Sequence, residues 1–287
     1  MTVPPDLVPN PQPFLRLTRD DATTPVDRPL AREMPVAIEY NGAGYAVLMA
    51  TPDNIVDLVQ GFSLAERLVS RDDALLDIDV HATGAGVIAR ATLPPHRTGD
   101  LLQRVRHRTS DSACGLCGVE TLEQALRPLP TITTMSRANR AAIFRALSAL
   151  RDHQPLNAAT GAAHCAALVD PQGSIRLARE DVGRHNAFDK LIGAMARAGL
   201  GWDGGFALLS SRCSYELVEK AALAACPLLV TLSAPTSLAL DRAAESGLRL
   251  ITLARRDAML ERADGPAQRN LGTAKQNLVE PDTLSYK

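Results

Sequence analysis

The second half of the chain alternates short apolar segments with longer amphipathic stretches, and this alternation constrains the fold more than any other feature. The first helical pattern spans residues 137–151, and a further stretch at 158–169 follows it. Strands that alternate with helices of this length are typical of an α/β layer with a largely parallel sheet. The expected strands are 174–178, 206–210, 228–232 and 248–253, and the expected helices are 137–151, 185–197, 215–225 and 237–246.

The first half has a different pattern, which predicts a smaller β-rich domain over residues 34–107. Two β-like runs, 35–40 and 45–50, flank the turn composition Asn-Gly-Ala-Gly, which favours a hairpin. Two further strands are expected at 75–80 and 86–92. Between the two pairs of strands, apolar residues with helical spacing run to residue 69, and Asp53 is the candidate N-cap. The fold class is therefore α/β, or α+β for the chain as a whole.

The remaining boundaries are predicted from composition. Residues 1–33 are rich in proline and lack an apolar period, so we expect an irregular arm. Residues 108–120 carry a cysteine pair flanked by glycine and are expected to form a mobile loop. Residues 121–260 are assigned to the larger α/β domain, and 261–287 to a polar tail.

Composition and charge exclude several classes of function. No apolar run approaches the roughly 20 residues that a membrane helix needs, so no membrane contact is expected. Lys and Arg number 31 against 32 Asp and Glu, which offers no general attraction to nucleic acid. The first residues lack the basic and apolar regions of a secretory signal, which predicts a cytoplasmic location with reduced thiols.

The cysteine pair Cys114-Gly-Leu-Cys117 is the most informative chemical motif. Basic residues before it and an expected helix start after it would both favour a thiolate. Four interpretations remain open: half of a zinc site, a redox pair, a carrier that holds sulfur as a persulfide, and a solvated loop without chemistry. Cys165, Cys213 and Cys226 lie singly in apolar contexts and are expected to be buried, so no second pair completes a zinc site and no structural metal is expected.

Polar segments follow three of the predicted strands, where open α/β sheets bind their ligands. Free N–H groups at helix starts, together with basic side chains, can hold a phosphate there. The alternative is that these residues are solvated or satisfied within the fold. The candidate binding residues are His164, Arg184, His185, Asn186, Ser233 and Thr236.

Over residues 34–253 these segments resemble the formate dehydrogenase accessory sulfurtransferases, the FdhD/NarQ family. The most specific block is Glu-Asp-Val-Gly-Arg-His-Asn-Ala at 180–187. The other matching segments are Pro-Val-Ala-Ile-Glu-Tyr-Asn-Gly at 35–42, Met-Ala-Thr-Pro-Asp at 49–53, Gly-Phe-Ser at 61–63, Cys-Gly-Leu-Cys-Gly at 114–118, Glu-Lys-Ala at 219–221 and Ser-Ala-Pro-Thr-Ser at 233–237.

The resemblance implies a fold and an activity. The larger domain would be similar to the cytidine deaminase fold, a three-layer α/β/α arrangement. The protein would be a sulfurtransferase that receives sulfur from a cysteine desulfurase as a persulfide on Cys114, with Cys117 as its partner. The sulfur acceptor would be the molybdenum bis(molybdopterin guanine dinucleotide) cofactor destined for apo formate dehydrogenase, bound as a substrate and partly mimicked by GDP or GMP.

The resemblance also implies where the cofactor is held. The family's cofactor-contacting stretch falls on Leu253, Ala254, Arg255, Arg256, Asp257 and Ala258. The chain departs from the family there, because Leu253 replaces the usual aromatic residue and the expected Tyr-Thr-His-Pro-Glu-Arg ending is absent. Helix N-termini and Arg184, Arg255 or Arg256 would hold the phosphates. A bis-guanine cofactor is pseudo-symmetric, which suits a homodimer.

Two other functions can be compared with these residues. A zinc deaminase needs His-x-Glu and Pro-Cys-x-x-Cys, but the chain has His-Cys-Ala at 164–166 and no Pro-Cys-x-x-Cys, so deamination is not expected. A chaperone that binds the cofactor without covalent sulfur transfer would use the same polar segments. Only the cysteine loop distinguishes the chaperone from the sulfurtransferase.

Overall fold

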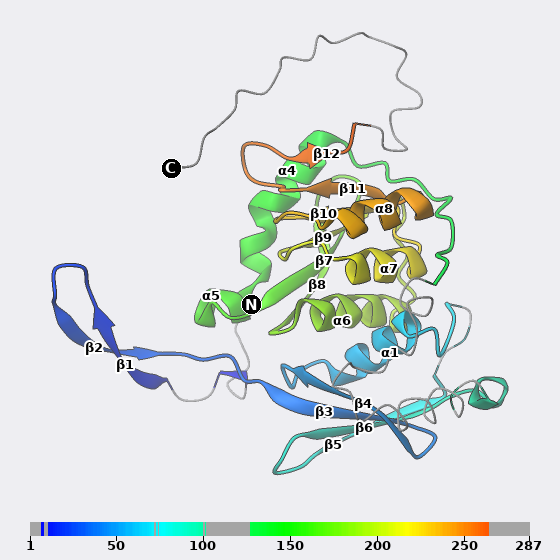
Figure 1. The fold of residues 1–287 in the computed structure, drawn as a ribbon, viewed down its shortest axis with the longest axis horizontal. Helices are drawn as coiled ribbons and strands as arrows, with labels where there is room; N and C mark the ends of the chain where they lie inside the picture. Colours follow the sequence, from blue (N-terminus) through cyan, green and yellow to red (C-terminus); the bar gives the residue numbers. More distant parts are fainter. Residues whose placement is uncertain are drawn as a thin grey trace, which may run out of the picture.

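The structure, a computed structural model, describes residues 7, 8, 11–71, 73, 75–99, 101 and 127–263. They form a four-stranded sheet, a six-stranded sheet and a separate two-stranded sheet. Figure 1 shows the four-stranded sheet at the bottom, α1 and α6 above it, and the six-stranded sheet above these helices. The predicted cysteine loop and residues 264–287 of the predicted tail lie outside the described residues.

The four-stranded sheet confirms the strands expected in the first half. Its order is β4 (Ala43–Ala50), β3 (Met34–Tyr40), β6 (Val87–Thr92), β5 (Asp77–Ala82). Alternate residues of β3, such as Val36 and Ile38, are fully buried against α1 (Ile55–Ala65), and η2 (Pro95–Arg97) follows β6. Asp53 is not the N-cap, contrary to expectation: Asn54 takes that position with a left-handed φ of 51°, and the Asp53 carboxylate accepts a hydrogen bond from its N–H.

The six-stranded sheet confirms the α/β class of the second half. Helices α4 and α5 cover one face of this sheet and α6, α7 and α8 cover the other, which gives three layers (Figure 1). The strands in spatial order are β12 (Leu260–Glu261), β11 (Arg249–Thr252), β10 (Leu228–Thr231), β9 (Phe206–Leu209), β7 (His164–Val169) and β8 (Ile175–Asp181). The helices are α4 (Arg140–Ala149), η3 (Leu150–His153), α5 (Pro155–Thr160), α6 (Arg184–Arg197), α7 (Tyr215–Leu223) and α8 (Ser237–Ser246).

The expectation of a largely parallel sheet is wrong. Only β9, β10 and β11 pair in parallel, whereas β7 is antiparallel to both of its neighbours and β12 is antiparallel to β11. The reason is the short connection from β7 to β8, since a tight turn can join adjacent strands only in antiparallel fashion. The alternation of strands with helices begins only after β8.

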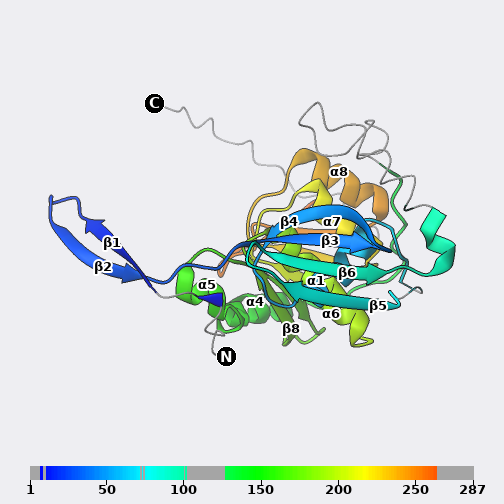
Figure 2. The ribbon, with the colours of Figure 1, turned by 90° about the horizontal axis from the view of Figure 1, so that it is seen from below.

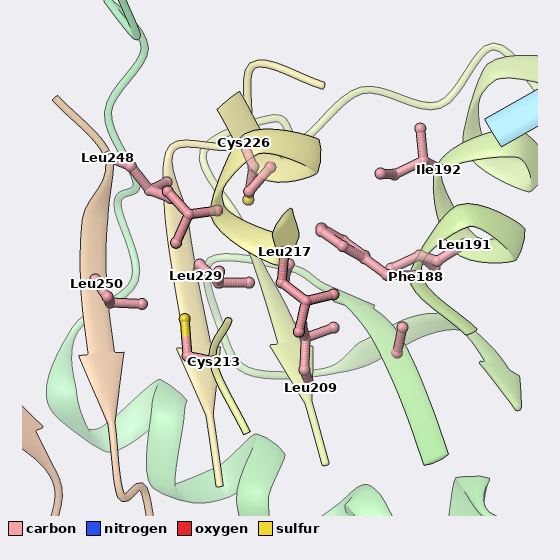
Figure 3. Close-up of a cluster of buried hydrophobic side chains, with 14 of the residues drawn as sticks. Phe188, Leu191, Ile192, Leu209, Cys213, Leu217, Cys226, Leu229, Leu248 and Leu250 are labelled. Atoms are coloured by element: carbon pink, nitrogen blue, oxygen red, sulfur yellow. The ribbon is translucent and has the colours of Figure 1, made fainter. Parts of the chain in front are cut away.

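Alternate strand residues supply two separate cores, one on each face of the six-stranded sheet. Leu208 and Val230 pack toward α4, while Leu209 and Leu229 pack toward the opposite helices. Figure 3 shows this second core, in which Phe188 of α6 lies among strand leucines. Such two-sided burial matches the nearly continuous apolar runs of these strands.

The first 33 residues are not wholly irregular, contrary to expectation. Strands β1 (Gln12–Leu17) and β2 (Thr23–Arg28) pair antiparallel and project from the body of the molecule (Figures 1 and 2). The proline content concealed this hairpin, because proline is tolerated in edge strands. The cross-strand pair Phe14 and Val26 has the aromatic and β-branched side chains that stabilise a two-stranded ribbon.

Candidate functional site

The carboxyl ends of four strands meet at one edge of the six-stranded sheet. Strands β8, β9, β10 and β11 all point toward this edge, and β7, which runs the opposite way, begins there. The backbone of Cys165 at the start of β7 exchanges hydrogen bonds with Ser210 at the end of β9. The polar segments singled out in the sequence therefore lie at a common edge, but on two different faces of the sheet.

One group of candidate residues lines a cleft of about 640 Å³ on the face covered by α4 and α5. Ser233, Ala254, Arg255 and Arg256 of the expected cofactor-binding set are found here. None of the described residues that line the cleft is acidic. Its apolar lining, from Leu147, Leu150, Leu232 and alanines, lies beside guanidinium groups, so the cleft offers both an apolar wall and cationic donors to a planar anionic ligand.

The sequence did not identify three further residues that line this cleft, Arg151 and Gln154 at the end of the first helical segment and Asn157 of α5. Ser210 also lines it, and it belongs to the polar segment Ser-Ser-Arg at 210–212 that was expected after the strand at 206–210. The sequence did contain a signal for Arg151. The expected helix 137–151 ends shortly before the chain enters the sheet at β7, so its last residues could have been expected near the edge where β7 begins. Glu180 of β8 holds the start of α5 in place, because its carboxylate accepts hydrogen bonds from the N–H groups of Leu156 and Asn157.

The stretch after β11 reaches the cleft through an unusual backbone turn. Leu253 adopts a left-handed φ of 48°, a strained conformation for a leucine. Its N–H donates to the Ser233 carbonyl oxygen, and Ala254, which is buried, donates to the Thr231 carbonyl oxygen. The turn thus places Arg255 and Arg256, both exposed, at the cleft. Leu253, Asp257 and Ala258 do not line the cleft.

A second group of candidates lies on the opposite face, where α6 begins. His164 at the start of β7 is half-buried, and burial together with the nearby Arg184 guanidinium lowers the pKa of its imidazole. The Nε atom of Arg184 is buried and has no hydrogen-bond partner among the described residues. These two side chains and His185 form a basic cluster at the edge of the sheet.

The third member of the cluster is held by a carboxylate on α7. His185 Nε2 lies 2.9 Å from Glu216 Oε2 and 3.2 Å from the hydroxyl of Ser214. Hydrogen bonding to His185 holds the pKa of the Glu216 carboxyl below its ordinary value. The imidazole is therefore fixed in orientation beside the N-termini of α6 and α7.

Two candidate residues have contacts within the fold. The amide of Asn186 donates to the Met49 carbonyl oxygen at 2.8 Å and to Asp181 Oδ1 at 3.1 Å, and the residue is buried. Thr236 caps α8, because its hydroxyl accepts a hydrogen bond from the N–H of Ala239. A role for either residue in ligand binding stays a prediction.

The three single cysteines are buried, as expected. Burial raises the pKa of the thiols of Cys213 and Cys226 to about 12 and raises that of Cys165 further. A thiol with such a pKa is almost entirely protonated near neutral pH and is a poor nucleophile. Cys114 and Cys117 lie outside the described residues.

In the part of the chain that the structure describes, no three His, Cys, Asp or Glu side chains gather as ligands of a metal ion would. Among the helices of the same residues, none has the length and apolar character needed to cross a membrane.

Comparisons with known proteins agree with one another. The model of the FdhD/NarQ family matches residues 31–260. A protein named sulfur carrier protein FdhD from Xanthomonas campestris pv. campestris (strain B100) is 46% identical over 241 residues, covering 84% of this chain and 86% of its own. A protein of the same name from Agrobacterium fabrum is 40% identical over 230 residues, covering 80% and 85%.

A solved structure has a similar fold. It is a crystal structure of a protein from Desulfotalea psychrophila that is assigned as a formate dehydrogenase accessory protein. The TM-score is 0.66 and the alignment covers 90% of this chain and 98% of that one, at 20% sequence identity. At this identity the likeness concerns the fold alone.

Proposed function

The chain belongs to the FdhD/NarQ family, and from this premise we propose that it is a sulfurtransferase. It takes sulfur from a cysteine desulfurase and transfers it to a molybdenum bis(molybdopterin guanine dinucleotide) cofactor destined for formate dehydrogenase. The observation that carries the proposal is the cleft at the carboxyl edge of the sheet, lined by Arg151, Arg255 and Arg256 and by no acidic residue among those described. Relatives named sulfur carriers support the same activity.

The first chemical step is the formation of a persulfide on Cys114. Its thiolate attacks the outer sulfur of the desulfurase persulfide, the S–S bond of the donor breaks, and the desulfurase cysteine leaves as a thiolate. Burial and a raised pKa disfavour Cys165, Cys213 and Cys226 as the nucleophile. Cys117 would assist as the partner thiol. Such chemistry needs reduced thiols, which supports the proposal of a cytoplasmic location.

The second step takes place at the cofactor, which we treat as the bound substrate. Arg255 and Arg256 would bind its phosphates by charge-assisted hydrogen bonds, together with Arg151, which lines the same cleft. The basic cluster of His164, Arg184 and His185 would meet a further anionic group at the same edge. GDP or GMP is the expected partial mimic. A homodimer would suit the pseudo-symmetry of the cofactor and is testable by light scattering.

Intact-protein mass spectrometry under anaerobic conditions tests the transfer step. The chain is incubated with a cysteine desulfurase and cysteine, and the mass gain of one sulfur is compared among the wild type, Cys114→Ala and Cys117→Ala. Cys213→Ala is the matched control, because its thiol is buried. We expect the gain in the wild type and the control, and its loss in Cys114→Ala. A gain that persists in Cys114→Ala would contradict the assignment, and no gain in any form would favour a cofactor-binding chaperone.

A further inference from the structure

A buried ion pair joins the end of β8 to α6, and its carboxylate, Asp181, is close enough to the basic cluster to interact electrostatically with His164. Lys190 Nζ is 2.6 Å from Asp181 Oδ2, and both side chains are 0% exposed. Removing two charges from water carries a large free-energy cost, so such a pair persists only where further hydrogen bonds satisfy both groups. A neutral pair of similar size would join β8 to α6 at a lower desolvation cost.

The remaining hydrogen bonds of this pair join two distant parts of the chain. The Asp181 carboxylate also accepts from the N–H of Thr51 at 3.1 Å, and Lys190 Nζ donates to the Thr51 carbonyl oxygen at 2.9 Å. The Thr51 hydroxyl accepts from the N–H of Val182 at 3.1 Å. Thr51 follows β4, so the segment at the end of the four-stranded sheet is bonded to the turn that begins α6.

The same carboxylate fixes the turn itself. Asp181 Oδ1 accepts from the N–H of Gly183 at 2.8 Å and from the amide of Asn186 at 3.1 Å. These two residues bracket Arg184 and His185, whose side chains take no part in this network and belong to the basic cluster. The backbone that carries these two side chains is therefore held on both sides by one buried carboxylate.

We infer that Asp181, Lys190 and Thr51 are positioning residues, which hold Arg184 and His185 in the orientation that binds an anionic group of the substrate. The inference rests on the proposed function. No candidate binding residue comes from the smaller sheet. Through Thr51, which follows β4, this sheet nevertheless takes part in substrate binding. The two sequence blocks at 49–53 and 180–187 are accordingly two halves of one contact.

A matched pair of lysine variants tests the inference, with GDP as the probe. Lys190→Met removes the cation from this network. Lys220→Met removes another lysine, which is partly buried and also pairs with α6, through Asp189 at 2.7 Å, but which makes no described hydrogen bond or ion pair with the turn at 181–186. Calorimetric titration with GDP and thermal melts are measured on both full-length variants.

Both variants should melt at a lower temperature than the wild type. Only Lys190→Met should weaken GDP binding, by about 10-fold, whereas Lys220→Met should stay within about twofold of the wild type. A merely structural role would not distinguish the two lysines. In case Lys190→Met does not fold, Thr51→Val removes the acceptor for Val182 while keeping the shape of the side chain, and it should weaken GDP binding by about threefold.

Equal GDP affinities of the two lysine variants, or wild-type affinity in Thr51→Val, would overturn the inference and leave the proposed function standing. Absence of GDP binding in the wild type would overturn the inference together with the cofactor part of that function. Formation of the persulfide on Cys114 is measured separately and does not depend on any of these outcomes.

Discussion

Gly61 of α1 lies so close to Asp189 of α6 that a Cβ atom on the glycine would overlap the Asp189 carbonyl oxygen. The reverse contact is equally close, because a Cβ on Gly193 of α6 would overlap the carbonyl oxygen of Asp57. Two glycines thus let the helix of the smaller sheet contact the helix of the larger one backbone to backbone.

Gly61→Ala should therefore destabilise the protein, because neither backbone can yield as a flexible side chain would. We expect a loss of about 1–3 kcal/mol in the free energy of unfolding, measured by urea denaturation. Gly84→Ala is the control, since a Cβ there meets no atom within 4 Å, and its effect should stay within about 0.5 kcal/mol. Equal stability of the two variants would show that the helices can separate without cost.

Alkylation of the native protein should modify at most two thiols. Cys165, Cys213 and Cys226 are buried and their thiols have raised pKa values, so only Cys114 and Cys117 remain as candidates. Iodoacetamide labelling at mildly alkaline pH, followed by mass spectrometry, counts the modified residues. The same reaction in urea should modify all five cysteines. Labelling of Cys213 in the native state would contradict its placement in the core.

His164 should make stability depend on pH in a predictable direction. Burial and the charges of Arg184 and His185 lower its pKa below the ordinary 6.5, so the unfolded chain binds more protons at mildly acidic pH. Stability should therefore fall as the pH drops through 6.5 toward the lower pKa of the folded state. His164→Gln cannot take up this proton.

The variant should consequently lose less stability than the wild type between about pH 7.5 and about pH 5. Urea denaturation at several pH values measures the difference. The depressed pKa of Glu216 contributes stability that is lost on acidification, but that contribution is common to both proteins. Parallel curves for the two proteins would argue against a depressed pKa at His164.

Arg151 should contribute to nucleotide affinity although the sequence did not single it out. It lines the same cleft as Arg255, and loss of one charge-assisted hydrogen bond should weaken GDP binding by about 10-fold in Arg151→Ala. The control is Arg145→Ala on the same helical segment, whose guanidinium donates to the Gln172 carbonyl oxygen outside the cleft. Equal affinities of the two variants, measured by calorimetry, would remove Arg151 from the site.

The spacing of apolar residues predicted the positions of those strands and helices that depend on local sequence alone. The strands around Leu208 and Val230 are apolar runs bounded by helical segments, and they appear where the pattern placed them. Strand direction was not predictable in the same way, because it depends on the length of a connection such as 170–174. The arm was misread because Pro25 suggested irregular chain, whereas an exposed edge strand tolerates proline.

The candidate site could be predicted only as a set of segments. Arg184 and Ser233 were both placed after strands, but the sequence does not tell on which face of a sheet each side chain lies. Tertiary contacts decided the remaining cases: Asn186 donates a hydrogen bond to the backbone of the smaller sheet, and Arg151 of η3 lines the same cleft as Arg255, about 100 residues further along the chain. Such long-range contacts leave no periodic pattern in a single sequence.

The hydrogen bonds from the start of α5 to Glu180 bear on how this protein can be engineered. One wall of the cleft is anchored on a side chain that arrives 23 and 24 residues later, from the strand at the edge of the sheet. A chimera that exchanges residues 150–160 for those of another family member will keep its cleft only if an acidic residue also stands at position 180. Residues 150–160 and the residue at position 180 must therefore be exchanged together.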